Sequence, residues 1–177
     1  MKGLVLYKSR TGFTKTYATW IAEELGYDLF DHTRLTPDFI AAYDCVIYGG
    51  RVHAGSIDNI KKVKALFANN AHPKLIVFAT GASPIDATEQ IDGVWKANFS
   101  EEEAASIPHF YLPSGLNYEK MGFGDRLLMK MLVKVLNAKK DKTDYEIGFS
   151  KAIASSYDHS SKEYIQDLLA CARSLAV

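Results

Sequence analysis

Short apolar runs alternate along this chain with segments whose apolar residues recur at helical spacing. The runs with the length of strands are Gly3–Tyr7, Tyr27–Asp31, Cys45–Gly49, Leu75–Ala79 and His109–Leu112. Helical spacing is clearest in Thr14–Leu25, Ile57–Asn69 and Ser83–Ala105, the last with a proline in its first turn. Such alternation is typical of a parallel sheet whose strands are joined by crossover helices. We therefore expect an α/β fold, a doubly wound five-stranded parallel sheet with helices on both faces.

Size and charge narrow the class of protein. The chain has 177 residues, of which 47% are hydrophobic, enough for one sizeable core, so we expect a single domain spanning residues 1–177. Lys plus Arg and Asp plus Glu both number 21, which leaves no overall field to attract nucleic acid. The two cysteines, Cys45 and Cys171, lack metal-site spacing, so we interpret both as buried thiols and expect no metal site.

No part of the sequence reads as a targeting or membrane-spanning segment. The N-terminal apolar run is too short for a signal peptide, and no apolar run approaches the ~20 residues of a spanning helix. We expect a cytoplasmic protein.

The turn after the first run carries the strongest binding signal. It consists of Ser9, Arg10, Thr11, Gly12, Phe13 and Thr14, between a strand and a helix. Backbone N–H groups at a helix N-terminus point at an anion, the helix dipole favours negative charge there, and the three hydroxyls add donors. This pattern predicts a phosphate site, although an ordinary helix cap would have a similar sequence.

Two more glycine-containing loops follow strands that end at the same edge of the expected sheet. Ligands of doubly wound folds bind beyond the carboxyl ends of the strands, where the winding direction reverses. The loops are Gly49–Gly55 and Thr80–Ser83. Glycines there let backbone approach a flat ligand closely. The candidate ligand contacts in these loops are Gly50, Arg51, Val52, His53, Gly55, Thr80, Gly81 and Ala82.

Other functions of doubly wound folds do not match the residues. A response-regulator receiver needs carboxylates where this chain has Lys8, Ser9 and Gly49. The stretch Gly50–Ser56 copies the glycine spacing of a nucleoside-triphosphate loop but lacks its lysine. A dinucleotide fingerprint is absent from the first turn.

The segment Leu4–Leu25 resembles the FMN-phosphate-binding segment of flavodoxins, whose T/S-x-T-G-x-T core stands here as Ser9–Thr14. More narrowly, Val46–Ser56 and Met121–Leu136 look like the matching stretches of flavodoxin-type, menaquinone-dependent protoporphyrinogen oxidases. The resemblance implies a flavodoxin-like fold with FMN as cofactor and its phosphate on Ser9–Thr14. It also implies a flavin ring between Gly50–Gly55, Thr80–Ala82 and Ser114–Tyr118, where Tyr118 could stack on the ring.

This resemblance leads us to expect an FMN-dependent oxidoreductase that passes electrons from a reduced organic substrate, protoporphyrinogen IX among the candidates, through FMN to a quinone. Arg51 and His53 are the candidate catalytic residues, because a cation near the ring would stabilise reduced anionic flavin. Three alternatives stay open: a flavodoxin that carries electrons between protein partners, an NAD(P)H-dependent FMN quinone reductase, and a degenerate domain without flavin.

The segment Lys120–Lys142 is basic and amphipathic. It holds seven Lys or Arg and two Asp, and Arg126, Lys130 and Lys134 recur every four residues beside a broad apolar face. A helix of this kind suits an anionic membrane surface or a partner groove, or it packs on its own domain. We therefore expect an inserted basic segment at about 120–142 that can place the protein peripherally at the inner face of a membrane.

Overall fold

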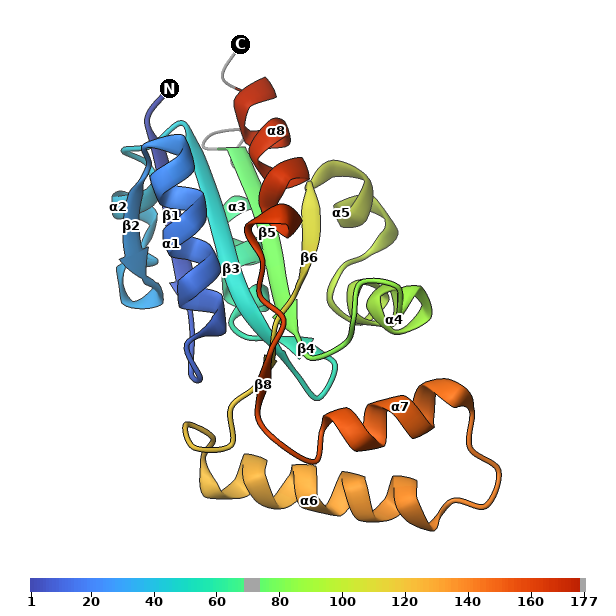
Figure 1. Cartoon of the computed structure of the whole chain (residues 1–177). Helices are drawn as coiled ribbons and strands as arrows, with labels where there is room; N and C mark the ends of the chain where they lie inside the picture. Colours follow the sequence, from blue (N-terminus) through green and yellow to red (C-terminus); the bar gives the residue numbers. More distant parts are fainter. Residues whose placement is uncertain (69–73, 176–177) are drawn as a thin grey trace.

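Five parallel strands form the centre of the molecule. The computed structural model describes residues 1–68 and 74–175. The strand order is β2-β1-β3-β5-β6, with the short strand β4 antiparallel on β3 (Figure 1). The strands are β1 (Gly3–Lys8), β2 (Asp28–Asp31), β3 (Cys45–His53), β4 (Ser56–Ile57), β5 (Lys74–Gly81) and β6 (His109–Pro113). The predicted doubly wound parallel sheet is confirmed, and each predicted strand corresponds to one of the five parallel strands.

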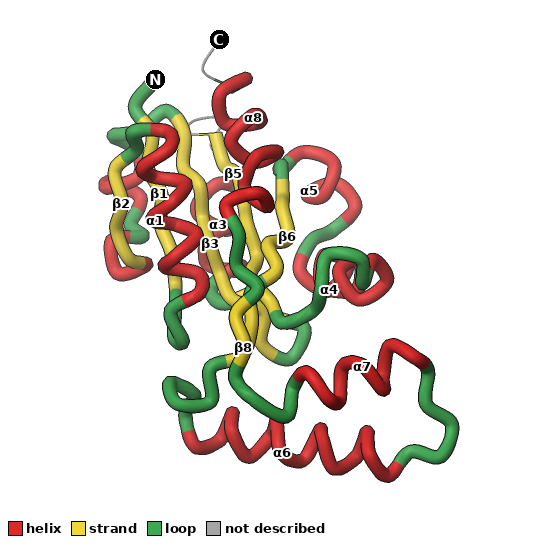
Figure 2. The backbone as a smooth tube through the Cα atoms, viewed as in Figure 1, coloured by secondary structure: helices red, strands yellow, loops and turns green. Residues whose placement is uncertain are grey.

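Helices cover both faces of this sheet (Figure 2). On one face lie α1 (Phe13–Leu25) and the C-terminal α8 (Gln166–Ser174), which follows a short 3₁₀ turn at Lys162–Ile165. On the other lie α2 (Pro37–Ile40), α3 (Ile60–Phe67), α4 (Thr88–Asn98) and α5 (Glu101–Ser106), with a second 3₁₀ turn at His32–Arg34. Successive strand residues such as Leu4 and Val5 point into opposite cores. The central strands therefore carry unbroken apolar runs, such as Val46–Tyr48 and Leu75–Ala79, rather than an alternating pattern.

The third strand runs further than its apolar run predicts. We expected a loop from Gly49, but β3 continues to His53 and turns through Ala54 and Gly55, both with positive φ, into β4. Two residues of positive φ form the tight turn that suits a β-hairpin. Gly49 serves packing in this extension, because a Cβ there would collide with the ring of Phe78.

Two predicted helices differ from those observed. The single helix expected over Ser83–Ala105 is wrong: α4 ends at Asn98, and α5 starts after Ser100. Ser100 and Glu103 form a reciprocal capping box, which begins a new helix. The helix expected over Ile57–Asn69 starts instead at Ile60, because Ile57 belongs to β4, where it pairs with Val52 of β3. Asn69 lies outside the described residues.

A helical hairpin projects from the carboxyl end of the sheet. It consists of α6 (Phe123–Ala138) and α7 (Asp144–Ala152), which run side by side below the strand ends in Figure 1. The short antiparallel strands β7 (Gly115–Leu116) and β8 (Tyr157–Asp158) pair at its base. The basic amphipathic segment of the sequence forms α6, whereas α7 was not predicted. Within the described residues, no helix is long and apolar enough to cross a bilayer.

The two cysteine side chains differ in environment. Cys45 is fully buried in β3, as expected, and its pKa is raised to about 11 by burial and then by the nearby Cys171 and Asp44. Cys171 on α8 is only partly buried, so the expectation of a buried thiol is wrong there. Both thiols are free.

Candidate functional site

The Ser9–Thr14 loop leaves β1 and starts α1. Gly12 precedes the helix with φ of 107°, a backbone conformation that glycine adopts without strain. Its N–H donates to Ser9 Oγ over 3.2 Å, which fixes the turn. The amides of the first helical turn have no partner within the helix, so they are available to an anion.

A cavity of about 330 Å³ adjoins this loop, and it is rich in positive charge. Arg10, Lys15 and Lys120 all contribute to its wall. Lys120 comes from the base of the hairpin, and its Nζ would lie 3.8 Å from a Cβ built on Gly12. The remaining lining residues are Tyr7, Ser9, Gly12, Asp31 and His32. Hydroxyls, helix amides and ammonium groups together form a donor set that suits a phosphate.

A narrow slot of about 80 Å³ lies beside the loop, between the strand ends and the base of the hairpin. Its wall includes residues of the first turn, of β3, of β5 and of the segment after β6. These are Thr11, Phe13, Thr14, Arg51, Val52, Thr80, Gly81, Ala82, Ser114, Gly115, Leu116 and Met121. Two buried hydroxyls join the turn to β5, Thr14 Oγ1 and Thr80 Oγ1 being 2.8 Å apart.

A third cavity of about 540 Å³ shares Ala82 and Ser114 with the slot. Its wall is mostly apolar and combines the loop after β5 with the hairpin and β8. The other lining residues are Ser83, Pro84, Ile85, Asp86, Pro113, Gly148, Phe149, Tyr157, His159 and Tyr164. Tyr157 donates its hydroxyl to the Ala82 carbonyl over 2.9 Å, which ties β8 to the rim. A flat apolar molecule could therefore lie next to whatever occupies the slot.

Asp125 of α6 contacts three basic side chains from the rim of the site, which is formed by the carboxyl ends of the strands and the loops that follow them. Its Oδ2 lies 3.3 Å from Arg51 Nη1 and 3.3 Å from Arg10 Nη1, and its Oδ1 lies 3.1 Å from His53 Nε2. Arg51 also donates from Nε to Asp58 Oδ2 over 2.9 Å. The guanidinium of Arg51 is thus held between two carboxylates at the edge of the slot.

The electrostatics of Asp125 follow from these neighbours. Its partial burial opposes the charged form, but the hydrogen bond from Arg51 and the charges of Arg10, Arg51 and His53 outweigh that effect. The pKa of the Asp125 carboxyl is therefore lowered, and the carboxylate is charged at neutral pH.

Residues 4–144 match the flavodoxin domain family. The chain belongs to this family. The chain is 31% identical over 90 residues to an uncharacterized protein of Methanocaldococcus jannaschii, a match that spans 48% of this chain and 57% of that protein. It is also similar to a flavoprotein in complex with FMN from Lactobacillus acidophilus, with 18% identity, a TM-score of 0.42, and coverage of 63% of this chain and 91% of that one. An NADPH-quinone reductase from P. pentosaceus has 10% identity, a TM-score of 0.45, and coverage of 80% and 100%.

The flavodoxin domain brings most of the predicted ligand contacts together. Three of them line the cationic cavity: Ser9, Arg10 and Gly12. Eight line the slot: Thr11, Phe13, Thr14, Arg51, Val52, Thr80, Gly81 and Ala82. The other four, Gly50, His53, Gly55 and Tyr118, line neither space.

Those four residues have other contacts or positions. Gly50 leaves room for Ile57 and the Asp58 carbonyl, Gly55 forms the β3–β4 turn, and His53 faces Asp125. Tyr118 donates its hydroxyl to the Ile153 carbonyl over 2.5 Å and so joins the two ends of the hairpin. Its stacking on a flavin ring stays a prediction.

Sequence reasoning missed the contribution of the hairpin to the site. Lys120, Met121 and Asp125 all come from its start. Lys15 was also missed, although its place three residues after the glycine of the turn puts it in the first turn of α1. No local pattern identifies the hairpin residues, because their role depends on how the hairpin folds over the rim.

The hydroxyl, amide and ammonium donors beside the Ser9–Thr14 loop suit the phosphate of FMN. The slot is too narrow for the flavin ring unless it widens. Pockets for ligands of this size usually exceed ~300 Å³, so a ring enters the slot only if part of the wall moves. Leu116 and Met121, on the hairpin side of the slot, belong to the segment that leads into α6. Both lie outside the central sheet, so movement of the segment between β6 and α6 would open the slot without disturbing the sheet.

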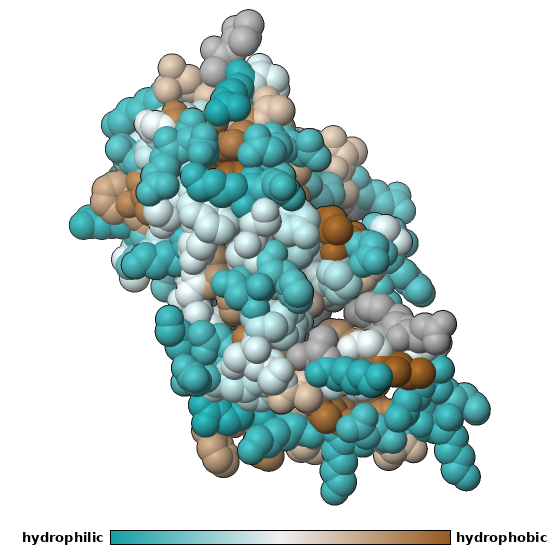
Figure 3. Space-filling model, viewed as in Figure 1, coloured by the Kyte–Doolittle hydropathy of each residue, from teal (hydrophilic) through white to brown (hydrophobic). Residues whose placement is uncertain are grey.

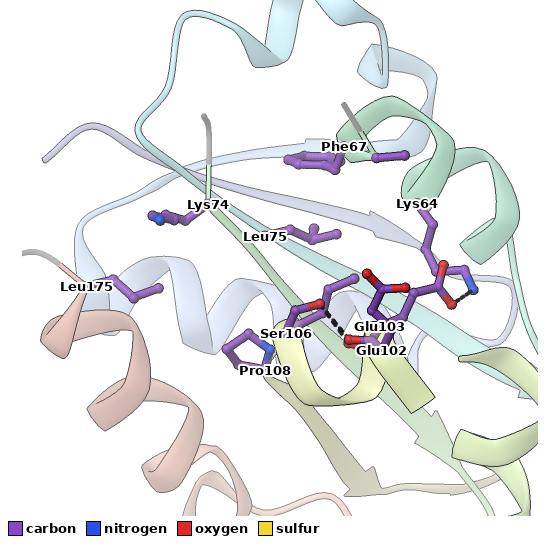
Figure 4. A pocket seen from close by; sticks show the side chains of 11 residues that line it. Lys64, Phe67, Lys74, Leu75, Glu102, Glu103, Ser106, Pro108 and Leu175 are labelled. Atoms are coloured by element: carbon purple, nitrogen blue, oxygen red, sulfur yellow. Dashed lines mark hydrogen bonds and ion pairs between the residues drawn. The ribbon is translucent and has the colours of Figure 1, made fainter. Parts of the chain in front are cut away.

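The largest cavity described, about 600 Å³, lies at the opposite end of the sheet (Figure 4). Lys74 and Leu75 begin β5 there, and Pro108 precedes β6. Lys64 and Glu103 form an ion pair of 2.5 Å at its edge. Because ligands of doubly wound sheets bind at the carboxyl ends of the strands, this cavity is not the cofactor site.

Proposed function

We propose that this flavodoxin domain binds FMN and acts as an oxidoreductase on a small organic substrate, with a quinone as electron acceptor. Ser9, Thr11 and the first amides of α1 would hold the phosphate, together with Lys15 and Lys120. The ring would lie in the slot between Arg51–Val52, Thr80–Ala82 and Ser114–Leu116. Bound FMN supplies the redox chemistry, and the protein supplies position and electrostatics.

The observation that carries the proposal is the apolar cavity that shares Ala82 and Ser114 with the slot. A carrier between protein partners needs no such space, since its ring edge meets the partner directly. A cavity of about 540 Å³ walled by Ile85, Phe149 and Tyr157 suits a flat organic molecule at contact distance from the slot.

The chemistry of the cavity wall favours an uncharged ring over a tetrapyrrole. Protoporphyrinogen IX carries two carboxylates, and a buried charge is costly unless an opposite charge pairs with it. Among the described residues that line the cavity, none is Lys or Arg, and Asp86 adds a negative charge. A quinone ring carries no charge and so needs no such partner in this cavity. Protoporphyrinogen IX remains one electron donor to test.

Arg51 and His53 would act on this site by position. Both are held by Asp125, and Arg51 is also held by Asp58, so the charge of Arg51 is balanced by carboxylates. A balanced cation stabilises negative charge on a ring less than a free one does. We therefore propose that Arg51 forms the edge of the slot and donates a hydrogen bond to an atom of the bound ring, while Asp125 keeps the guanidinium in place.

The test begins with the absorbance spectrum of the protein after addition of FMN. The loaded protein is then mixed anaerobically with protoporphyrinogen IX, menaquinol, NADH or NADPH, and afterwards with menaquinone. Bleaching by an organic donor and recovery on adding quinone would support the proposal. Bleaching by NAD(P)H alone would favour an NAD(P)H-dependent quinone reductase, and a one-electron cycle without turnover would favour a carrier. Failure to take up FMN would refute the proposal.

A variant pair tests the cavity itself. Ile85 lines it and is 49% exposed, so Ile85→Arg introduces charge without disturbing the core. We expect KM for menaquinone to rise about tenfold, with FMN affinity unchanged. Ile85→Val keeps the wall apolar and should behave like the wild type. Equal KM values in all three proteins would place the acceptor elsewhere.

A further inference from the structure

The outer face of α6 is apolar and open to solvent. Phe123 is 85% exposed and Val135 is 64% exposed, at opposite ends of the helix. The exposed large apolar side chains of the helix are Phe123, Leu127, Leu128, Met131, Leu132 and Val135. Figure 3 shows apolar brown and tan beside hydrophilic teal over the hairpin. Soluble surfaces rarely leave such a continuous apolar stripe uncovered, and one that is uncovered usually marks a binding surface.

The helix is apolar on its other side as well. Met129, Val133 and Leu136 are half-buried, on the side opposite the open stripe, and α7 runs alongside α6. Apolar side chains on two sides of one helix need cover on both sides. Here the protein covers one side only, so the stripe requires an occupant from outside the described fold.

Positive charge borders the stripe. Lys130 and Lys134 stand four residues apart along one edge, and Lys140 lies at the far end of the hairpin, all exposed. Lys139 does not add to this charge, because its Nζ is paired with Glu146 Oε1 of α7 over 2.7 Å. Arg126 does not join them, because its guanidinium donates back to the Tyr118 carbonyl. The one acidic residue of α6, Asp125, is turned toward Arg51 and away from the stripe. The open face therefore combines apolar side chains with positive charge, and no acidic side chain of α6 lies on it.

We propose that the outer face of α6 docks on an anionic lipid surface. Apolar side chains enter the headgroup region while lysines at the edge meet anionic headgroups, which is how amphipathic helices bind in the plane of a membrane. A second copy of this chain is a poorer occupant, since it would bring the same lysines against each other. The long stems of Lys130 and Lys134 also let their ammonium groups reach headgroups while the helix lies deeper.

Docking of α6 on a membrane would also affect access to the apolar cavity. This consequence rests on the proposed function. The hairpin lies over the carboxyl ends of the strands, and the apolar cavity is walled partly by Gly148 and Phe149 of α7. Docking through α6 would therefore hold the cavity close to the membrane in which a quinone dissolves. Docking itself depends only on α6.

The test is sedimentation of the full chain with vesicles of phosphatidylcholine alone, or with about one third phosphatidylglycerol. We expect wild-type protein to sediment with the anionic vesicles and to dissociate as salt rises. Lys130→Glu with Lys134→Glu should weaken binding at least about tenfold, and so should Phe123→Ser with Val135→Ser. The matched control, Lys61→Glu with Lys62→Glu on the exposed side of α3, should weaken it much less.

Three results would overturn the proposal: no sedimentation of wild-type protein with anionic vesicles, equal sedimentation of every variant, or binding that ignores anionic lipid. Self-association that Val135→Ser abolishes would show that a second copy covers the stripe instead. Circular dichroism and FMN uptake report whether each variant folds. A chain that binds vesicles but takes up no FMN would refute the proposed oxidoreductase and leave docking intact.

Discussion

Asp125 accepts a hydrogen bond from Arg51 over 3.3 Å, although the two residues are 74 positions apart in the chain. The contact joins the hairpin to the end of β3. Arg10 and His53 approach the same carboxylate, so one acidic side chain fastens the hairpin to two separate parts of the rim. The hairpin is therefore held over the slot by charge as well as by the β7–β8 pair at its base.

Replacing Asp125 by Ala should loosen the hairpin without unfolding the sheet. The change leaves Arg10, Arg51 and His53 facing one another without the carboxylate, and a lost partner of this kind costs about 1–2 kcal/mol. We expect local opening to become roughly 5- to 30-fold easier, measured as faster limited proteolysis within α6 and α7. Asp141→Asn, at an exposed acid in the α6–α7 turn, is the control and should leave the rate unchanged. Equal rates in all three proteins would mean that Asp125 does not hold the hairpin.

The contacts of Asp125 should hold the hairpin less firmly as the pH falls. The pKa of Asp125 is lower in the folded protein than in the unfolded chain, whose value is about 3.9. Its contribution is therefore fully present above about pH 4 and is lost as pH falls through the folded value. As the pH falls below about 4, cleavage of the hairpin by pepsin should therefore accelerate more in the wild type than in Asp125→Asn. A wild-type profile parallel to that of the variant would contradict this assignment.

The sheet could be predicted because its signal is local. Leu4, Val5 and Leu6 are all fully buried, and a strand buried on both faces needs an unbroken apolar run. The hydroxyl-rich turn after β1 is likewise contained in six consecutive residues. The break between α4 and α5 was also readable, because Ser100 and Glu103 have the spacing of a capping box. Thr143 and Glu146 repeat that spacing at the start of α7.

The rest of the site could not be read from local pattern. Gly49 and Gly50 looked like loop residues, yet their lack of a side chain makes room for Phe78 and Ile57 from neighbouring strands. Asp125 belongs to α6 and Lys120 to the turn before it, and the amphipathic pattern of this segment does not show how it is oriented relative to the sheet. Their roles appear only once the hairpin folds back over the strand ends, a relationship set by tertiary contacts across the chain.

Lys120 should contribute to binding of the FMN phosphate. Because its side chain is exposed, we expect a modest contribution of about 1 kcal/mol, or roughly fivefold weaker binding of FMN in Lys120→Ala. Riboflavin lacks the phosphate, so its affinity should not change. Fluorescence titration with both flavins measures the two effects. Lys140→Ala, at the far end of the hairpin, should change neither affinity, and an equal loss for both flavins in Lys120→Ala would show that the residue acts on the ring or on folding.

The hydrogen bond between Thr14 and Thr80 should matter for stability because both hydroxyls are buried. Thr80→Val or Thr14→Val leaves the remaining hydroxyl without this partner, which costs about 1–3 kcal/mol, whereas replacing both removes the unpaired group and should recover most of the loss. Urea unfolding of the two single variants and the double variant measures this coupling directly. Thr88→Val at an exposed position of α4 should stay within about 0.5 kcal/mol of the wild type. If the two losses simply add in the double variant, the hydroxyls do not depend on each other, and the turn is held to β5 by packing alone.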